Sequence, residues 1–419
     1  MVVARADSKE EEMHTASCIR TSVREMSAPR IETADVVIVG ARCAGAATAM
    51  LLARAGHDVV MVDRASFPSD TLSTHAIARG GVVQLHRWGL LDDVLASGAP
   101  PIRRVEFFAG DDPVVRMVKD RYGVDFLVAP RRHVLDPLIQ GAAVDAGARL
   151  RAGTTVTGVV RNSAGRVIGI TGRDGDGPIA VRARFVVGAD GLKSRIGRSV
   201  GARVLERRAS ASATHYAYFA GNWPAMEYHL GDGSFAGVFP THRGEACVWV
   251  CAADDRALGH RRRHPTIDAA FRAMVEETSP SLASRLRDAV GTSTARGMMS
   301  IPNQIVEPIG DGWALVGDAG YHRDAITGHG ISDAFRDAEL LAAALDRALF
   351  SPGDESEALR GYHAERDRML REIFEITCEL SGVPQLARFV ELQKQLGVAI
   401  DRHARELADR PAFAAATAA

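Results

Sequence analysis

Residues 34–64 read ADVVIVGARCAGAATAMLLARAGHDVVMVDR, and this stretch decides the fold. The apolar, β-branched run at 35–39 predicts a buried parallel strand. A glycine-punctuated turn follows at 40–45. The small and apolar residues 46–55 favour a helix, which Gly56 ends. The stretch therefore begins as a strand, a tight turn and a helix.

A second apolar run at 59–62 predicts another strand, and Asp63 follows it. In such a unit Gly40 permits the turn and Gly45 lets the helix pack closely on the strand. The free N–H groups at the start of the helix form a site for a pyrophosphate. Asp63 can accept hydrogen bonds from both hydroxyls of an adenosine ribose, and it would repel a 2′-phosphate. The residues therefore predict FAD or NAD as the ligand, and not NADP.

Arg42 stands where this kind of turn normally carries its middle glycine. Its side chain either points away from the phosphates or adds a positive charge beside them, and the sequence leaves both possibilities open. Arg64, directly after Asp63, is a further candidate contact of the cofactor.

The composition excludes several classes of protein. The 419 residues carry a formal net charge of −1, with 46% hydrophobic and 25% charged residues. A chain of this length forms two or three domain-sized units, and its charge gives no basic field for nucleic acid or an anionic membrane. The five cysteines have neither metal nor disulfide spacing, and no apolar run is long enough to span a bilayer. We expect a soluble, cytoplasmic protein without a metal site.

Two more strand ends carry an Asp-Gly or Gly-Asp pair. Residues 185–188 predict a buried strand that runs into Asp190-Gly191, and residues 311–316 predict one that ends at Gly317-Asp318. A glycine-rich segment, Gly328 to Ile331, then opens a long helix and offers unpaired N–H groups. A ligand crevice lies at the carboxyl ends of parallel strands.

The remaining pattern predicts a second, antiparallel region. Residues 212–252 read as three or four antiparallel strands with Tyr, Phe and Trp, which would make a wall for an apolar or aromatic ligand. Further predictions are a disordered tail at 1–33 with Met26 as a possible start, a helix at 81–91, short strands at 104–108, 114–118 and 125–128, and helices from 354 to 407.

With these three motifs in this order, the chain resembles the para-hydroxybenzoate-hydroxylase-like FAD enzymes, including their geranylgeranyl-reductase-like and halogenase relatives. The resemblance implies an α/β fold in which a Rossmann-type FAD-binding domain is interleaved with an antiparallel-sheet substrate domain, followed by a helical C-terminus. The expected domains are the tail at 1–33, a discontinuous FAD-binding domain at 34–102, 129–205 and 295–350, the substrate domain at 103–128 and 206–294, and C-terminal helices at 351–419.

The resemblance also implies roles for matching positions. Gly40 and Gly45 would hold the pyrophosphate, Asp63 the ribose, and Arg132 would lie against the cofactor. Asp318, after Gly317, would bind the ribityl chain. The other expected contacts are Asp190 and Gly191 with FAD and the nicotinamide donor, and the backbone of Gly328, Gly330 and Ile331 with the flavin pyrimidine edge.

The function that the resemblance implies is that of a single-component FAD monooxygenase, of a kind common in secondary metabolism. NAD(P)H would reduce FAD, O2 would form a C4a-hydroperoxide, and an apolar or aromatic small molecule would be hydroxylated or epoxidised. We expect a monomer or homodimer. The halogenase motif Trp-x-Trp-x-Ile-Pro is absent from the sequence, which argues against halogenation.

Two alternatives stay open. One is an FAD-dependent double-bond reductase of the geranylgeranyl-reductase type, and the other is a flavin-binding protein without turnover. No catalytic acid or base can be assigned from the sequence. His75 and His329 are candidates because they fall in loops expected near the flavin, although either one could be an ordinary loop histidine.

Overall fold

The computed structural model describes residues 29–411 and Phe413. Most of the predicted tail, residues 1–28 with Met26, lies outside the described residues. Residues 30–33, which the sequence analysis placed in that tail, instead begin strand β1 (Arg30–Val39), because they pair in parallel with residues 179–182 of β8 (Gly177–Gly188).

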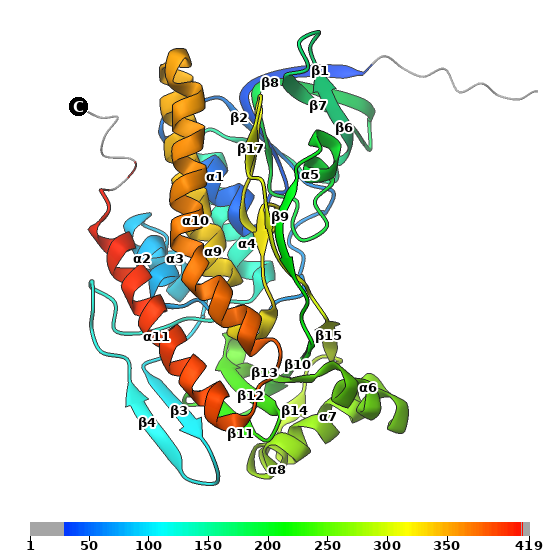
Figure 1. Cartoon of the computed structure of the whole chain (residues 1–419), viewed down its shortest axis with the longest axis vertical. Helices are drawn as coiled ribbons and strands as arrows, with labels where there is room; N and C mark the ends of the chain where they lie inside the picture. The colour runs from blue at the N-terminus through cyan, green and yellow to red at the C-terminus, as the bar shows by residue number, and fades with distance from the viewer. Residues whose placement is uncertain (1–28, 412, 414–419) are drawn as a thin grey trace, which may run out of the picture.

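The nucleotide half is built on a mainly parallel sheet in which β8, β1 and β2 are neighbours (Figure 1). Val36, Val37 and Ile38 are fully buried because helices and strands cover both faces, which explains the uninterrupted apolar run. Helix α1 packs between α4 and α9 on one face. The elements are β17 (Ile309–Gly310), β18 (Trp313–Leu315), β2 (Val59–Val62), β5 (Arg149–Arg151), the antiparallel extension β6 (Thr155–Arg161) and β7 (Val167–Asp174), and helices α1 (Cys43–Arg54), α4 (Arg132–Asp145) and α9 (Gly330–Phe350).

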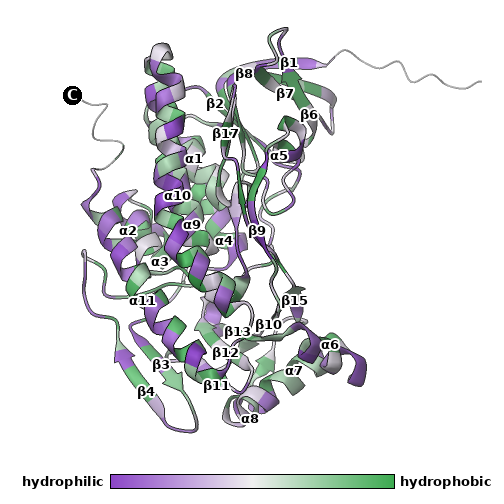
Figure 2. Ribbon diagram, in the orientation of Figure 1, coloured by the Kyte–Doolittle hydropathy of each residue, from purple (hydrophilic) through white to green (hydrophobic). Residues whose placement is uncertain are grey.

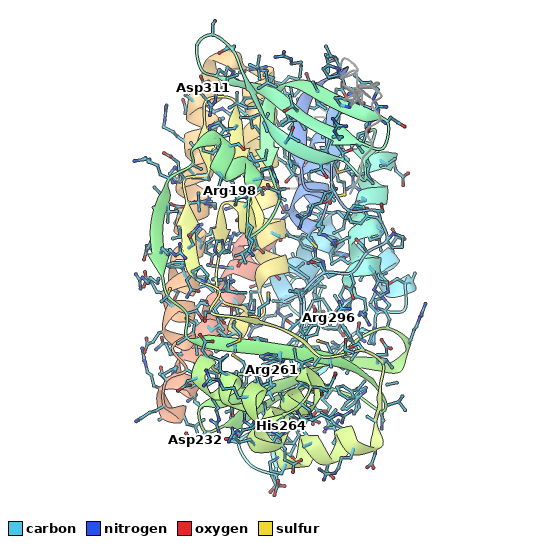
Figure 3. All side chains as sticks on the ribbon, turned by 90° about the vertical axis from the view of Figure 1, so that its right-hand side faces the viewer. Arg198, Asp232, Arg261, His264, Arg296 and Asp311 are labelled. Atoms are coloured by element: carbon cyan, nitrogen blue, oxygen red, sulfur yellow. The ribbon has the colours of Figure 1, made fainter. Side chains whose placement is uncertain are left out.

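A second sheet lies at the other end of the molecule (Figure 1); because the sequence predicts that it binds the substrate, we call this part the substrate half. It is antiparallel except where β11 meets β3, and three helices cover its outer face. In Figure 3, Asp311 and Arg198 mark the nucleotide half, whereas Arg261, His264 and Asp232 mark the substrate half. The elements, in sheet order, are β14 (Val290–Gly291), β10 (Ser212–Ala220), β13 (Glu245–Ala253), β12 (Ser234–Pro240), β11 (Met226–Gly231), β3 (Arg104–Phe108) and β4 (Pro113–Met117), with β15 (Arg296–Met299) beside β10 and helices α6 (Asp254–Arg263), α7 (Ile267–Thr278) and α8 (Pro280–Asp288).

The C-terminal helices connect the two halves. Helix α10 (Glu355–Leu380) packs on α9, and α11 (Leu386–Asp409) reaches the inner face of the substrate sheet (Figure 1). In Figure 2 the central strands and α1 are largely hydrophobic, whereas α10 and α11 alternate in hydropathy. The other elements are α2 (Arg79–Arg87), α3 (Leu91–Ala96), α5 (Arg195–Val200), the small sheet β19 (Tyr321–His322), β16 (Asn303–Val306) and β9 (Val204–Arg208), and the 3-10 turns η1 (His242–Gly244), η2 (Gly317–Ala319), η3 (Ala325–Thr327) and η4 (Pro352–Asp354).

The predicted fold class is confirmed, with three local corrections. The predicted strand at 125–128 is wrong, since this segment makes only isolated bridges. The helix expected at 81–91 ends at Arg87, and α3 follows after Gly89. Residues 296–299 pair with β10 in the substrate sheet and so fall outside the FAD-binding domain to which 295–350 were assigned. Among the described residues, no helix is both long and apolar enough to cross a membrane.

Candidate functional site: a nucleotide crevice joined to an aromatic wall

The first turn is closed by backbone contacts that only glycine permits. Gly40 has a φ of +104°, and a Cβ there would lie 2.3 Å from the carbonyl oxygen of Ala189. A Cβ on Gly45 would lie 1.8 Å from the carbonyl oxygen of Gly40. Helix α1 begins after Arg42, whose side chain does not cap it. The first-turn N–H groups are therefore available for an anion.

The side chain of Arg42 has partners in two other segments of the chain. Its guanidinium donates to the carboxylate of Asp136 at 2.8 Å and to the hydroxyl of Ser69 at 3.0 Å, and it lies over the ring of Phe67. The side chain thus links the turn to the loop after β2. Arg42 itself occupies the position at which such a turn normally has its middle glycine.

Arg132 lies in the same buried ionic cluster. Its Nε and Nη2 atoms donate to the two oxygens of Asp136 at 2.9 and 3.1 Å, and Asp136 is fully buried. The pKa of Arg132 is raised: burial acts to lower it, but Cys43 and Asp136 outweigh that effect. The positive charge of Arg132 also works to lower the pKa of Asp318, so the first turn of α4 lies near the third motif.

Asp318 lies in the 3-10 turn η2, directly after β18. It is solvent-exposed, yet the surrounding protein raises its pKa to about 6 by desolvation, against the opposing charge of Arg132. The neighbouring Gly317 has a φ of +59°, and a Cβ there would lie 2.8 Å from the Cβ of Ala44 in α1. The third motif therefore packs against the same helix as the first.

Asp63 and Asp190 already have backbone partners. The two carboxylate oxygens of Asp63 accept from the N–H groups of Ala41 and Ala65, each at 2.8 Å. Asp190 accepts from the hydroxyl of Ser194 and from the first N–H groups of α5. Asp63 can use its remaining lone pairs for a ribose, whereas Asp190 mainly fixes α5. Arg64, next to Asp63, is exposed, and Gly191, next to Asp190, has open space where a Cβ would be.

The start of α9 offers a second set of N–H groups. Its N-cap residue is His329, no side chain caps it, and Ile331 is buried in the first turn. Gly328 and Gly330 have no heavy atom within 4 Å of an added Cβ, so a planar ligand could approach the backbone. The preceding loop is anchored by Asp324, which accepts from Ser210 and Ser212 at the edge of the substrate sheet.

These residues fit FAD by donor chemistry and space. Two uncapped helix starts supply N–H groups, the glycines leave room for close approach, and Asp63 and Asp318 are carboxylates at strand ends. The packing of Gly40 against Ala189, and of Gly317 against Ala44, brings the three sequence motifs side by side, and we call this region the nucleotide crevice.

Arg131 joins the crevice to the substrate sheet, and the sequence analysis missed this role. It bridges Asp70 and Glu245 at 3.0 Å each, and its guanidinium carbon lies 3.5 Å from the ring centroid of Tyr218. Two adjacent arginines therefore face different compartments: Arg132 the nucleotide cluster and Arg131 the sheet. The adjacent positions of Arg131 and Arg132 in the sequence were the available signal.

His75 is also at this junction. Its Nδ1 atom donates to the carbonyl of Ala129 at 2.9 Å, which leaves Nε2 as a hydrogen-bond acceptor. Burial lowers its pKa to about 3, so the ring stays neutral. It stacks on Tyr218 with ring centroids 5.6 Å apart, and its φ of +48° is unusual for a non-glycine residue. The other candidate, His329, does not lie in this segment; it is the N-cap residue of α9.

The inner face of the substrate sheet forms an aromatic wall with three unpartnered polar atoms. Among the described residues, His75 Nε2, Tyr218 OH and Trp249 Nε1 are buried and have no hydrogen-bond partner. The other ring residues of this wall are Tyr216, Tyr228, Phe235 and Phe239, and α11 packs over them through Phe389, Leu392 and Leu396. Because a buried polar group without a partner is costly, the wall is suited to a ligand that supplies those partners.

Comparison with known proteins agrees with this geometry. A family model described as "FAD binding domain" matches residues 33–377. Menaquinone reductase from Mycobacterium tuberculosis (strain H37Rv) is 29% identical over 337 residues, which cover 75% of this chain and 77% of that protein. Digeranylgeranylglycerophospholipid reductase from Methanocella arvoryzae is 24% identical over 343 residues, with 79% and 82% covered.

Solved structures share the fold at low identity. The flavin-dependent brominase Bmp2 superimposes with a TM-score of 0.75 at 20% identity, covering 90% of this chain and 93% of that one. PqsL, described as a probable FAD-dependent monooxygenase from Pseudomonas aeruginosa, gives 0.73 at 24%, covering 88% and 100%. The matched family model spans most of the chain and gives one conclusion: the chain belongs to the FAD binding domain family, and it is an FAD-dependent oxidoreductase.

Proposed function

We propose that this protein is a single-component FAD monooxygenase that takes electrons from NAD(P)H and hydroxylates or epoxidises an apolar, aromatic small molecule. The observation that carries the proposal is the aromatic wall, in which His75 Nε2, Tyr218 OH and Trp249 Nε1 lack partners. A planar ring with one polar substituent would bury its faces on the wall and pair with these atoms.

Each part of the chain has a task in this proposal. Gly40, Gly45 and the start of α1 hold the pyrophosphate, Asp63 the ribose and Asp318 the ribityl chain. The N–H groups of 328–331 stabilise negative charge at the flavin pyrimidine edge, worth roughly 0.3–2 kcal/mol for the helix dipole alone. Bound FAD supplies the redox chemistry and the activation of O2. Arg131, held by Asp70 and Glu245, keeps the wall in place beside it.

A second candidate is an FAD-dependent double-bond reductase. The names of the curated relatives, menaquinone reductase and digeranylgeranylglycerophospholipid reductase, favour it. In that reaction the same wall would hold an unsaturated apolar substrate, and O2 would not be consumed. Cytoplasmic location and a monomeric or homodimeric state stay predictions of the sequence.

One pair of measurements separates the candidates. The FAD-loaded protein is supplied with NAD(P)H and a panel of aromatic and unsaturated substrates, once in ¹⁸O₂ and once without oxygen. A monooxygenase gives a product that contains ¹⁸O and no product anaerobically. A saturated product formed without oxygen would overturn the proposal in favour of the reductase. Failure to oxidise NAD(P)H across the panel would contradict both.

A further inference from the structure

A small cavity lies beside the start of α9. Its volume is about 30 Å³, and α2, α9, α10 and α11 all contribute to it. A water molecule needs roughly 10–15 Å³ by this kind of measure, so the cavity has room for about two. It is lined by Ala78, Gly80, His329, Ser332, Asp333, Arg336, Ile373, Ile400, His403, Ala404 and Leu407.

Two imidazoles, those of His329 and His403, line the cavity. Nδ1 of His329 is buried without a partner among the described residues. Asp333 is not free, since its carboxylate is bound by Arg323 and Arg336. His403 is half-buried on α11 and therefore connects the cavity with the protein surface. A water in the cavity would give the Nδ1 atom of His329 the partner it lacks.

Both rings stay neutral near pH 7. Burial lowers the pKa of His329 to about 4, and Arg323 lowers it further while Asp333 acts in the opposite direction. Burial and Arg336 likewise lower the pKa of His403 to about 4, against Asp333 and Glu406. A neutral imidazole can accept a proton at one nitrogen and release one at the other, and a low pKa keeps it from retaining the proton.

Both candidate reactions need a route for protons. A monooxygenase turnover consumes NAD(P)H, O2, substrate and one proton to give oxygenated product, water and NAD(P)+. A double-bond reduction consumes NAD(P)H, the unsaturated substrate and one proton to give the saturated product and NAD(P)+. Resting on the FAD site described above, we propose that His403, water in the cavity and His329 carry this proton from solvent to the edge of FAD at the start of α9. His329 would contact the cofactor, and His403 acts through it as a positioning residue.

The test follows proton uptake and not catalysis. The FAD-loaded protein is reduced without oxygen, the pH is lowered in a stopped-flow mixer, and a pH indicator reports the uptake. We expect His403→Ala to slow uptake by roughly 10²-fold, as for the loss of a positioned acid–base group. Added 4-methylimidazole should restore the rate. FAD content and midpoint potential should equal those of the wild type.

Two further variants complete the design. His363→Ala is the matched control, because this half-buried histidine of α10 pairs with Asp367 and does not line the cavity. It should take up protons at the wild-type rate. Ala404→Leu keeps both histidines but fills the cavity, and it should also slow uptake.

Each outcome decides the proposal. Wild-type uptake in FAD-loaded His403→Ala, or slow uptake that imidazole does not restore, would overturn this inference and leave the proposed function intact. A protein that binds no FAD would overturn both.

Discussion

Buried polar groups have hydrogen-bond partners in the nucleotide crevice, whereas several on the aromatic wall have none within the part of the chain that the structure describes. In the crevice Asp136 is paired with Arg42 and Arg132, and the oxygens of Asp63 accept from backbone N–H groups. On the wall His75 Nε2, Tyr218 OH and Trp249 Nε1 have no partners among the described residues. The crevice is therefore held in shape by its own contacts before a cofactor arrives, whereas the wall depends on a ligand to satisfy it. Four predictions test this difference.

The largest effect is expected where the crevice is closed by backbone. Gly45→Val would place a Cβ 1.8 Å from the carbonyl oxygen of Gly40, so α1 must move away from β1. We expect a loss of at least about 3 kcal/mol in the free energy of unfolding, with loss of bound FAD. Urea denaturation and the flavin absorbance of the purified variant measure both. The control Gly141→Ala, at an exposed site of α4 with no neighbour within 4 Å, should gain up to about 1 kcal/mol.

The second prediction concerns pH and His75. Its folded-state pKa of about 3 lies below the ordinary value of 6.5, so the unfolded chain binds the proton more readily. Its contribution to stability is complete above pH 6.5 and falls as the pH drops toward 3, at about 1.4 kcal/mol per unit. His75→Asn tolerates the left-handed backbone and should flatten this fall. Parallel stability curves for the two ligand-free proteins between pH 6.5 and 4 would contradict the burial of a neutral ring.

The third prediction concerns a change that should weaken the binding of FAD without destabilising the fold. Asp318→Asn removes a charge from the nucleotide crevice, and a hydrogen bond to a charged group is worth about 1.5–3 kcal/mol. The dissociation constant of FAD should rise roughly 10- to 150-fold, as measured by flavin fluorescence. The ligand-free protein should be at least as stable as the wild type near pH 7, because desolvation disfavours the charge that the change removes. The control is Asp311→Asn, an exposed ion-pair partner of Arg166 at the other end of the same strand region. If both variants bind FAD with the same dissociation constant, Asp318 does not contact the cofactor.

The smallest effect distinguishes an unpartnered hydroxyl from a partnered one. Tyr218 and Tyr362 are both buried, but only the hydroxyl of Tyr362 has a partner, the carbonyl oxygen of Leu315 at 2.8 Å. Tyr218→Phe should stabilise the ligand-free protein by about 1 kcal/mol, and Tyr362→Phe should destabilise it by a similar amount. If both changes destabilise the protein in urea titrations, the hydroxyl of Tyr218 is not an unsatisfied polar group in the ligand-free protein.

The sequence by itself determined the nucleotide unit. Gly40, Gly45 and Asp63 lie within one contiguous stretch, and the physics of a strand, turn and helix acts between near neighbours, so their arrangement follows from spacing. The positions of Asp190 and Asp318 at strand ends could be predicted for the same reason. The path of the Arg42 side chain was not, because its partners Ser69 and Asp136 come from segments that only the fold brings to the turn.

The sequence predicted an aromatic wall within residues 212–252, but tertiary structure alone decided which polar atoms of that wall lack partners, and it alone formed the cavity. Tyr218, Trp249 and His75 belong to three separate segments, and nothing in their local sequence says that their polar atoms would be buried without partners. The same holds for His329 and His403, which α9 and α11 bring to one cavity. Local pattern fixes what depends on neighbouring residues, whereas burial and pairing depend on contacts between distant ones, and those exist only once the chain has packed.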